Sequence, residues 1–275
     1  MLQLHVIASG SSGNAAIVQD GTAKTAFLID CGICKRDLIA GCEGAGVDPA
    51  SLTDILITHD HSDHTKGLGV AVRGLAKLGA RLTIHASSAV RAASKPLEEA
   101  LGEETVIFRS FRAGEALSVG SAQVHVFRTS HDAAESFGFR VEGEGEAGAA
   151  DILGYLTDTG CVTPEAHDAL QGVRLLALEA NHDVSMLREG PYPYLLKQRI
   201  LSDRGHLSND QAAAELEQLL SCPGATALEQ VVAMHVSREN NLYMQAQEAL
   251  ARVLVQHQHP ASALVAKQKT PISLS

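Results

Sequence analysis

Four side chains that commonly bind metals are crowded into one short turn of the sequence. They follow the apolar run Asp54–Thr58 and precede a segment with helical spacing: His59, His61, Asp63 and His64. Neutral imidazoles and carboxylates are ligands for zinc, manganese and iron, and a rigid turn can aim them at one point. With 13 histidines in the chain, an H-x-H-x-D-H pattern arises by chance in about two such sequences per thousand. The turn is therefore predicted to be a metal site rather than a solvated polar loop.

Three further candidate ligands stand at the ends of later apolar runs: His131 after Gln123–Thr129, Asp158 after Ile152–Thr157, and His235 at the end of Gln230–His235. Four ligands from one turn cannot complete the shells of two metals, and α/β sheets form their sites where the carboxyl ends of strands meet. Each residue alone has the plain interpretation of a capped strand end. Together with the first cluster they predict a site for two divalent metal ions per chain, Zn²⁺ or Mn²⁺, with iron as a further option.

The elements that must position these residues alternate between strand and helix. Short β-rich runs are predicted at Leu2–Ala8, Ala26–Asp30, Asp54–Thr58, Arg81–His85, Gln123–Thr129, Ser136–Val141, Ile152–Thr157, Leu175–Glu179 and Gln230–His235. Helices are predicted at Thr65–Leu78, Pro164–Leu170, Tyr194–Leu201, Asn209–Leu220 and Leu242–Val255, the fourth with Ser208 as its N-cap. The chain is therefore of the α/β class. Strands without intervening helices between residues 105 and 158 argue against a purely parallel doubly wound sheet.

Length and composition favour one large domain, residues 1–275, with 45% apolar residues to build a core. The first residues carry no basic region before their apolar stretch, so no signal peptide is predicted. No apolar run approaches the roughly 18 residues that a membrane span needs. We expect a soluble, cytoplasmic protein without a membrane partner, and the sequence leaves its oligomeric state open.

The cysteines, a Gly- and acid-rich stretch and the C-terminal residues can be interpreted without a functional role. The five cysteines do not resemble a disulfide scaffold, so reduced thiols are expected, although Cys31 and Cys34 form a C-x-x-C that could be a redox pair or half a zinc site. The Gly- and acid-rich stretch Glu142 to Asp151 is predicted to be an exposed hairpin loop. The last dozen residues fit either a final strand or a loose tail.

The order H-x-H-x-D-H, lone His, lone Asp and final His resembles the metallo-β-lactamase superfamily, and the match spans nearly the whole chain. This resemblance implies an αββα sandwich of two mixed sheets with helices outside. It also implies that His59, His61 and His131 hold one metal, that Asp63, His64 and His235 hold the other, and that Asp158 bridges them. The implied nucleophile of this dinuclear hydrolase is a metal-bridging hydroxide, which Asp63 would orient.

The sequence around His131 resembles the phosphodiesterase branch, because thioesterases and lactamases of the superfamily usually carry a Gly-His-Thr-x-Gly type turn instead. The element Gly205-His206-Leu-Ser208-Asn209 is similar to one in phosphodiesterase relatives whose histidine acts on the scissile phosphate. His206 is thus a candidate general acid, with a structural N-cap histidine as the alternative.

The chain as a whole also resembles the YycJ/WalJ-type branch, bacterial proteins regarded as DNA exonucleases. The resemblance rests on Gly10 to Asn14, Asp30-Cys-Gly32, Glu179-Ala-Asn181-His182-Asp183, the His206 element and the segment after His235. It suggests substrate-binding roles for Ser12, Asn14, Asn181, His182 and Ser208. The turn from Gly10 to Asn14 could present amides to an anion or simply connect strands.

The expected function is a metal-dependent phosphodiesterase or DNA exonuclease with DNA ends as substrate. The net charge of -10 argues against non-specific binding of polyanions. The main cluster of basic residues near His206 consists of Lys197, Arg199 and Arg204. A small cyclic phosphodiester hydrolase is the main alternative. A glyoxalase II-like thioester hydrolase is more distant, and a non-enzymatic binding module is disfavoured because all seven ligand positions are filled.

Overall fold

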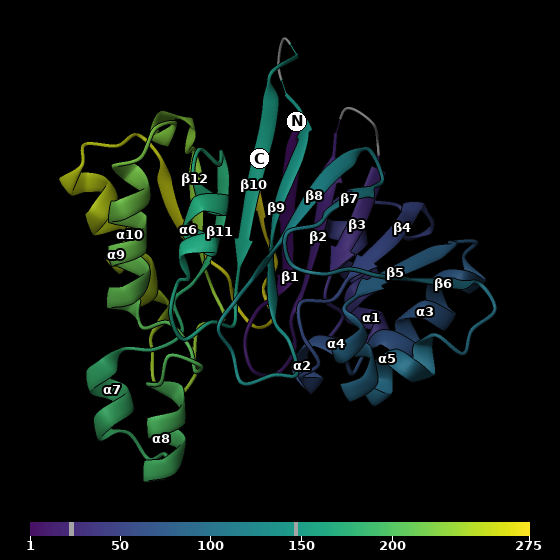
Figure 1. The fold of residues 1–275 in the computed structure, drawn as a ribbon, viewed down its shortest axis with the longest axis horizontal. Helices are drawn as coiled ribbons and strands as arrows, with labels where there is room; N and C mark the ends of the chain where they lie inside the picture. Colours follow the sequence, from purple (N-terminus) through teal and green to yellow (C-terminus); the bar gives the residue numbers. More distant parts are fainter. Residues whose placement is uncertain (22–24, 146–147) are drawn as a thin grey trace.

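Two mixed β-sheets form the centre of the molecule (Figure 1). The computed structural model describes residues 1–21, 25–145 and 148–275. In this part of the chain the first sheet has the order β14 (Ile272–Leu274), β1 (Leu2–Ala8), β2 (Ala15–Asp20), β3 (Thr25–Ile29), β4 (Leu52–Leu56), β5 (Leu82–Ala86), β6 (Val106–Ser110). The second has the order β13 (Ser262–Val265), β12 (Gln230–Met234), β11 (Leu175–Glu179), β10 (Ala150–Leu156), β9 (Phe137–Glu144), β8 (Ala122–Arg128), β7 (Ala116–Val119).

Helices cover the outer faces of both sheets (Figure 1). On the side of the first sheet lie α1 (Lys35–Gly44), α2 (Ser62–Thr65), α3 (Leu68–Lys77), α4 (Ser88–Ala93) and α5 (Lys95–Ala100), with the short 3-10 turn Pro49–Ser51. On the side of the second lie α6 (Pro164–Leu170), α9 (Asn209–Leu220) and α10 (Tyr243–Gln256), while α7 (Val184–Glu189) and α8 (Tyr194–Ile200) project beyond it. This is the αββα sandwich that the sequence predicted.

Each sheet joins an antiparallel half to a parallel half. The pairs from β14 to β3 are antiparallel and those from β3 to β6 are parallel. The pairs from β7 to β10 are antiparallel and those from β10 to β13 are parallel. Parallel strands end at the same edge of a sheet. The residues that follow β3, β4, β10, β11 and β12 therefore gather along one edge of the sandwich.

A continuous apolar core fills the space between the sheets. Its largest fully buried side chains include Tyr155, Phe111, Phe137 and Phe139. The ring of Phe111 meets those of Phe137 and Phe139 edge-on, with centroids 5.0 and 6.1 Å apart. Such edge-to-face pairs contribute about 0.5–1.5 kcal/mol each beyond their burial. A second apolar cluster lies between the outer face of the second sheet and the helices α6, α9 and α10.

A buried ion pair ties the first strand to the opposite sheet. Arg174 donates to both carboxylate oxygens of Asp151, at 2.7 and 3.0 Å, and to the carbonyl of Leu2 at 2.7 Å. The amide of Leu2 donates to the same carboxylate at 2.6 Å. Asp151 is 4% exposed, so its predicted place in an exposed loop is wrong: it belongs to β10. The hairpin between β9 and β10 is confirmed, but its loop is shorter than predicted, and residues 146–147 lie outside the described ones.

The other boundaries differ from the predictions in a few places. The helix predicted to begin at Thr65 is split into α2 and α3 at the turn of Lys66 and Gly67. The C-terminal residues form two short strands, one in each sheet. Elements without a predicted counterpart are β2, β6, β7, α1, α4, α5 and α7. In the described part of the chain, no helix combines the length and apolarity needed to cross a membrane.

Candidate metal centre

All seven predicted ligands meet at the edge where the two sheets face each other. The turn after β4 supplies His59, His61, Asp63 and His64 from the first sheet, and the ends of β8, β10 and β12 supply His131, Asp158 and His235 from the second. Within each of four groups the potential ligand atoms lie within 4.8 Å of one another: His59, His61 and His131; Asp63, His64 and His235; His59, His64 and Asp158; and Asp158, Glu179, His206 and His235. The first two groups match the two metal shells implied by the family resemblance.

One carboxylate orients two of the histidines. Asp30, fully buried at the end of β3, accepts from Nδ1 of His64 at 2.7 Å and from the hydroxyl of Thr58 at 2.8 Å. That hydroxyl in turn accepts from Nδ1 of His59 at 2.9 Å. In the neutral form of each ring the proton is thus held on Nδ1, and Nε2 keeps the lone pair that a metal would bind. Nε2 of His59 is buried with no hydrogen-bond partner among the described residues, as a metal ligand would be before its metal binds.

The histidines of the second sheet are held in the same way. Nδ1 of His131 donates to the carbonyl of Gly205 at 2.9 Å, so its Nε2 points to the cluster, 3.2 Å from Nδ1 of His61. Nδ1 of His235 lies 3.4 Å from Glu179, and its backbone amide donates to Ser9 at 2.7 Å. Ring nitrogens fixed by outer partners and converging inward are the arrangement that metal-binding histidines take. The donor set therefore fits divalent ions of the zinc and manganese type.

The shifted pKa values of the cluster show that its buried carboxylates favour nearby positive charge. Burial by itself raises the pKa of the Asp158 carboxyl, but His235, His64 and the other rings outweigh it and hold that pKa well below its usual value. Burial lowers the pKa of His235, yet Asp158 and Asp63 overcome this and raise it to about 10. The His64 pKa is also raised, by Asp158 and Asp30 against burial. Without cations, protonated histidines balance the buried carboxylates.

Three residues of the site have left-handed backbone conformations. Asp30, Asp158 and His235 have φ angles of 60°, 54° and 51°. For residues with a side chain this conformation costs about 1–2 kcal/mol. Each of the three stands directly after or close to a strand end, where the backbone must turn sharply so that the side chain faces the opposite sheet. The strain is concentrated at the residues that hold or orient the candidate metals.

The turn from Gly10 to Asn14 packs against the ligand turn. Gly13 has a φ of 139°, and a Cβ there would lie 2.4 Å from the carbonyl of Gly32, so only glycine fits. The amide of Gly13 donates to the carbonyl of Gly10 at 3.0 Å, which confirms the predicted tight turn. The side-chain amide of Asn14 lies 2.9 Å from Nε2 of His64 and 3.2 Å from Asp63. The turn thus helps to fix the side chains of His64 and Asp63, two of the candidate ligands.

A cavity of about 220 Å³ opens onto the cluster. Its lining combines the candidate ligands His61, Asp63, Asp158 and His235 with Ser11, Asn181, Tyr192, Leu196, Arg199, Ile200, His206 and Ser237. The three residues Tyr192, Leu196 and Arg199 come from α8 and the segment before it, so these form one wall of the cavity. Arg199 is paired with Asp132, which follows His131.

His206 stands inside this cavity and is held by a buried acid. Its Nδ1 donates to Glu179 at 2.7 Å, and its ring stacks on that of His235 with centroids 5.1 Å apart. The N-cap of α9 is Ser208, with a capping box to Gln211, so the alternative of His206 as an N-cap is wrong. Burial raises the pKa of Glu179, but the His206 ring outweighs it and lowers that pKa to about 2.

The other predicted substrate-binding residues have separate places. Asn181 lines the cavity, and its side-chain amide also donates to the carbonyl of His235 at 2.7 Å. Ser12 lines a neighbouring cavity instead. His182 is 1% exposed and Ser208 caps α9, so both lie behind the cavity wall.

Sequence reasoning assigned no role to Asp30 and Glu179. Both end apolar strand sequences, Ala26-Phe-Leu-Ile-Asp30 and Leu175-Leu-Ala-Leu-Glu179, as the predicted ligands do. A carboxylate at the end of a fully buried strand was the signal that could have found them. The C-x-x-C residues do not join the site: Cys31 is buried, Cys34 is exposed, and both are free thiols, as expected.

Comparisons with known proteins agree with this geometry. Residues 25–236 match the family described as Beta-lactamase superfamily domain. The chain is 32% identical over 253 residues to a Bacillus anthracis protein named Exodeoxyribonuclease YycJ, covering 92% of this chain and 89% of that protein. It is 33% identical over 254 residues to Exodeoxyribonuclease WalJ of Streptococcus pneumoniae, covering 91% and 87%. The fold resembles that of the metallo-beta-lactamase fold protein YhfI from Bacillus subtilis, with a TM-score of 0.71, 16% identity and 99% of each chain covered.

Proposed function

The chain belongs to the metallo-β-lactamase superfamily, and from this premise we propose that it is a dinuclear metal-dependent phosphodiesterase that removes nucleotides from DNA ends. The observation that carries the proposal is His206, which lines the same cavity as the candidate ligands and whose Nδ1 donates to the buried Glu179 at 2.7 Å. The cluster of candidate ligands alone does not distinguish among the hydrolytic reactions of the superfamily. An oriented imidazole beside it suits a reaction that must protonate an alkoxide leaving group.

The metals would be held by the residues named above. His59, His61 and His131 form one set and Asp63, His64 and His235 the other, with Asp158 in contact with both sets. When bound, two divalent ions activate water and neutralise charge on the phosphodiester. Zn²⁺ and Mn²⁺ both accept this mixture of imidazole and carboxylate ligands.

The side chains of the cavity divide the remaining tasks. Asp63 is fixed by Asn14 at 3.2 Å and His235 at 3.4 Å, so it can orient an attacking water molecule. Arg199 lines the wall as a cation for the substrate phosphate, with Asp132 as its resting partner. Glu179 accepts from Nδ1 of His206, so a protonated ring would carry its second proton on Nε2, on the opposite side, and could donate that proton to the departing oxygen.

The substrate assignment to DNA rests on the two relatives named exodeoxyribonucleases, each similar over about nine-tenths of both chains. A cavity of about 220 Å³ holds little more than one phosphate and part of a sugar, which agrees with attack at an end. The same small size and the net charge of -10 favour a small cyclic phosphodiester as the second candidate. The five free thiols agree with a reducing compartment, and we propose the cytoplasm.

Three substrates tested in parallel decide the class of reaction. End-labelled DNA, bis-nitrophenyl phosphate and a glutathione thioester are incubated with protein loaded with Zn²⁺ or Mn²⁺, with and without a chelator. We expect chelator-sensitive cleavage of the DNA and the small diester, and none of the thioester. Turnover of the small diester without DNA refutes the nuclease, and turnover of the thioester alone refutes the phosphodiesterase.

The role of His206 is tested by His206→Ala. We expect both metals and the fold to be retained while DNA turnover falls by about 10²–10⁴, the usual contribution of a positioned acid. Glu179→Gln should give a smaller loss of turnover, because the ring remains but its proton is no longer fixed. Unchanged turnover removes His206 from the reaction, and loss of metal makes it a ligand.

A further inference from the structure

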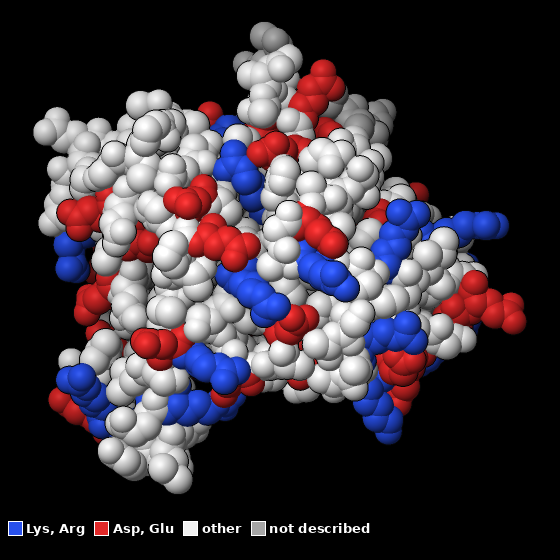
Figure 2. All heavy atoms as spheres, viewed as in Figure 1, with Lys and Arg blue, Asp and Glu red and all other residues white. Residues whose placement is uncertain are grey.

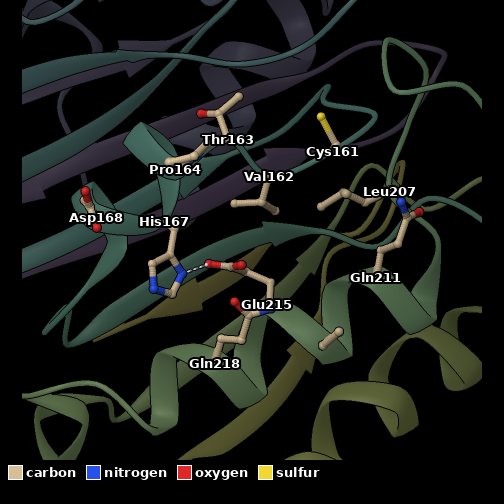
Figure 3. Close-up of a pocket in the computed structure, with 11 residues that line it drawn as sticks. Cys161, Val162, Thr163, Pro164, His167, Asp168, Leu207, Gln211, Glu215 and Gln218 are labelled. Atoms are coloured by element: carbon tan, nitrogen blue, oxygen red, sulfur yellow. Dashed lines mark hydrogen bonds and ion pairs between the residues drawn. The ribbon is translucent and has the colours of Figure 1, made fainter.

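Two cavities away from the candidate metal centre differ in the charge of the residues that line them. The cavity between α6 and α9 has the acidic residues Asp168 and Glu215 in its lining, and His167 donates to Glu215 at 2.9 Å (Figure 3). No lysine or arginine of the described residues lines it. This cavity is therefore unsuited to a polyanion. A different cavity, on the other side of the turn from Gly10 to Asn14, has the opposite character.

We call this second cavity the basic cavity and define it by its lining. It has a volume of about 560 Å³, and its apolar part is formed by residues such as Ile7, Ala8, Ile33 and Pro271. The cationic residues Arg36, Lys66 and Lys269 also line it, with Asp37 as the single carboxylate. Ligand sites typically have volumes of about 300–1,000 Å³, apolar walls and a few placed polar groups. The basic cavity meets this description.

Three cations at one cavity are unusual in a chain with a net charge of -10. On the face of the molecule shown in Figure 2, lysine and arginine are interspersed with acidic residues rather than gathered in one patch. Arg36 donates to Asp37 at 3.1 Å, but its side chain is 88% exposed, so a ligand can replace this contact. Lys66 and Lys269 are exposed as well. The local excess is two positive charges, which favours an anionic ligand.

The basic cavity and the metal cavity share a wall one turn thick. Ser11 lines the metal cavity and Ser12, the next residue, lines the basic cavity. Gln268 fixes this wall by accepting from the amide of Ser12 at 3.0 Å and donating to the carbonyl of Gly13 at 2.8 Å. Lys66 donates to the carbonyl of Ser12 at 3.1 Å from the other side. A chain with a phosphate in the metal cavity can cross Ser11 and Ser12 and reach the cations.

We propose that the basic cavity is a second nucleotide subsite for single-stranded DNA. The base of the nucleotide next to the scissile phosphate lies on the apolar walls, and its phosphate lies between Arg36 and Lys269. The inference rests on the proposed function, because it extends the same strand from one cavity into the next. Phosphate contacts of this kind position the strand without reading its sequence.

Two consequences follow for substrates. Oligonucleotides that reach the basic cavity are cleaved with a higher kcat/KM than diesters that fill only the metal cavity. The advantage falls with salt, because each cation that neutralises a phosphate of a single strand contributes about 0.7 to the slope of log affinity against log salt concentration.

The test is the double variant Arg36→Gln, Lys269→Gln, which leaves the contact of Lys66 with the Ser11–Ser12 wall in place. Its kcat/KM on a tetradeoxynucleotide should fall about 10-fold or more, while that on bis-nitrophenyl phosphate stays at the wild-type value. Binding of a fluorescent phosphorothioate tetranucleotide, which resists cleavage, should weaken in parallel, and the salt slope should decrease by about 1.4.

The matched control is Lys77→Gln, Arg81→Gln, which removes the same charge from exposed positions at the end of α3 and the start of β5. It should retain wild-type values in each measurement. Equal effects of the two double variants would reduce the result to net charge and overturn the subsite. Parallel loss on both substrates would overturn it too, since the residues would then support the metal cavity.

The binding measurement keeps this inference separate from the proposed function. If the wild type cleaves neither DNA nor diester, the nuclease proposal fails, yet binding of the phosphorothioate strand still reports on the cavity. Unchanged binding in the Arg36→Gln, Lys269→Gln variant would overturn the subsite whatever the activity.

Discussion

At the scale of single residues, Asp30 has an influence beyond its own contacts. Its carboxylate orients His64 directly and His59 through Thr58, so one side chain fixes the protonation of a ligand in each of the two shells. The ring orientation and tautomer of metal ligands depend on such outer partners, which contribute about 10–100-fold to metal affinity.

Asp30→Asn is therefore expected to lower metal affinity about 10–100-fold. Asparagine tolerates the φ of 60° at this position, so the backbone is preserved while the charge is removed. Metal affinity is measured by competition with a chromophoric chelator. The matched control is Asp54→Asn, which removes the carboxylate 2.6 Å from His85, a buried pair between β4 and β5 of the same sheet that holds none of the candidate ligands. An equal loss in the control would assign the effect to general destabilisation.

A buried histidine behind the cavity makes the fold sensitive to acid. Burial lowers the pKa of His182 from 6.5 to about 4, and neither ring nitrogen has a hydrogen-bond partner among the described residues. The neutral form is favoured in the folded state, so its stabilising contribution is complete above pH 6.5 and is lost as the pH falls towards 4. The loss amounts to about 3 kcal/mol.

His182→Leu should accordingly reduce the difference between the free energies of unfolding at pH 7.5 and pH 4.5, measured by urea denaturation. Wild-type protein should lose stability over this interval, and the variant should lose less by about 2–3 kcal/mol. If the two proteins respond identically to pH, His182 is not the group that titrates.

At the scale of elements, the sheets are joined by few but specific polar contacts. Arg174 on the segment before β11, Asp151 on β10 and the backbone of Leu2 on β1 form one buried network with distances of 2.6–3.0 Å. Arg174 also pairs with Glu229 at 3.0 Å, but Glu229 is 55% exposed, so removing Asp151 deprives the guanidinium of its buried partner, which typically costs about 3–5 kcal/mol.

Asp151→Ala is expected to lower the free energy of unfolding by about 3–5 kcal/mol in urea. The exposed Asp168 on α6 provides the control, since Asp168→Ala should change stability by less than about 0.5 kcal/mol. A small effect at Asp151 would mean that water reaches Arg174 and compensates for the missing carboxylate.

Some helices and strands could be predicted from the sequence with their bounds, and others could not. α6, α9 and β11 have the predicted bounds, because a Pro or a capping box marks the helix starts and β11 is uniformly apolar. α1 was missed because only Leu38, Gly41 and Cys42 are buried, too few for a visible period.

The candidate ligands were predictable because four of them share one turn and the others end apolar strands. Asp30 and Glu179 act through partners 34 and 27 residues away in the sequence, and no local pattern encodes such a pairing. The walls of the two cavities depend on the packing of distant loops in the same way.

At the scale of the whole molecule, the candidate ligands come from both sheets, so a bound metal would link the two. Without cations, the cluster holds the buried carboxylates Asp158 and Glu179 and the partly buried Asp63. Metal binding should therefore stabilise the folded state by mass action.

Removal of metal by a chelator is expected to lower Tm by about 5–10 °C, since a free ion at 100 times its Kd contributes about 2.7 kcal/mol. Differential scanning calorimetry with and without added Zn²⁺ or Mn²⁺ measures the shift. Asp158→Ala should show little dependence on metal, because this residue contacts both ligand sets. A Tm that is the same with metal and with chelator would contradict a site that links the two sheets.

The pairing of β14 with β1 brings residues from the two ends of the sequence side by side, with Leu4 opposite Leu274 (Figure 1). These ends lie at the edge of the sandwich away from the candidate metals, because β1 runs from Leu2 towards Ser9, which contacts His235. A short peptide can therefore join residue 275 to residue 1, and circularly permuted versions with new ends in an exposed connection should fold and bind metal. For the same reason, immobilisation through either end should leave the cavity mouths open to long, surface-tethered DNA.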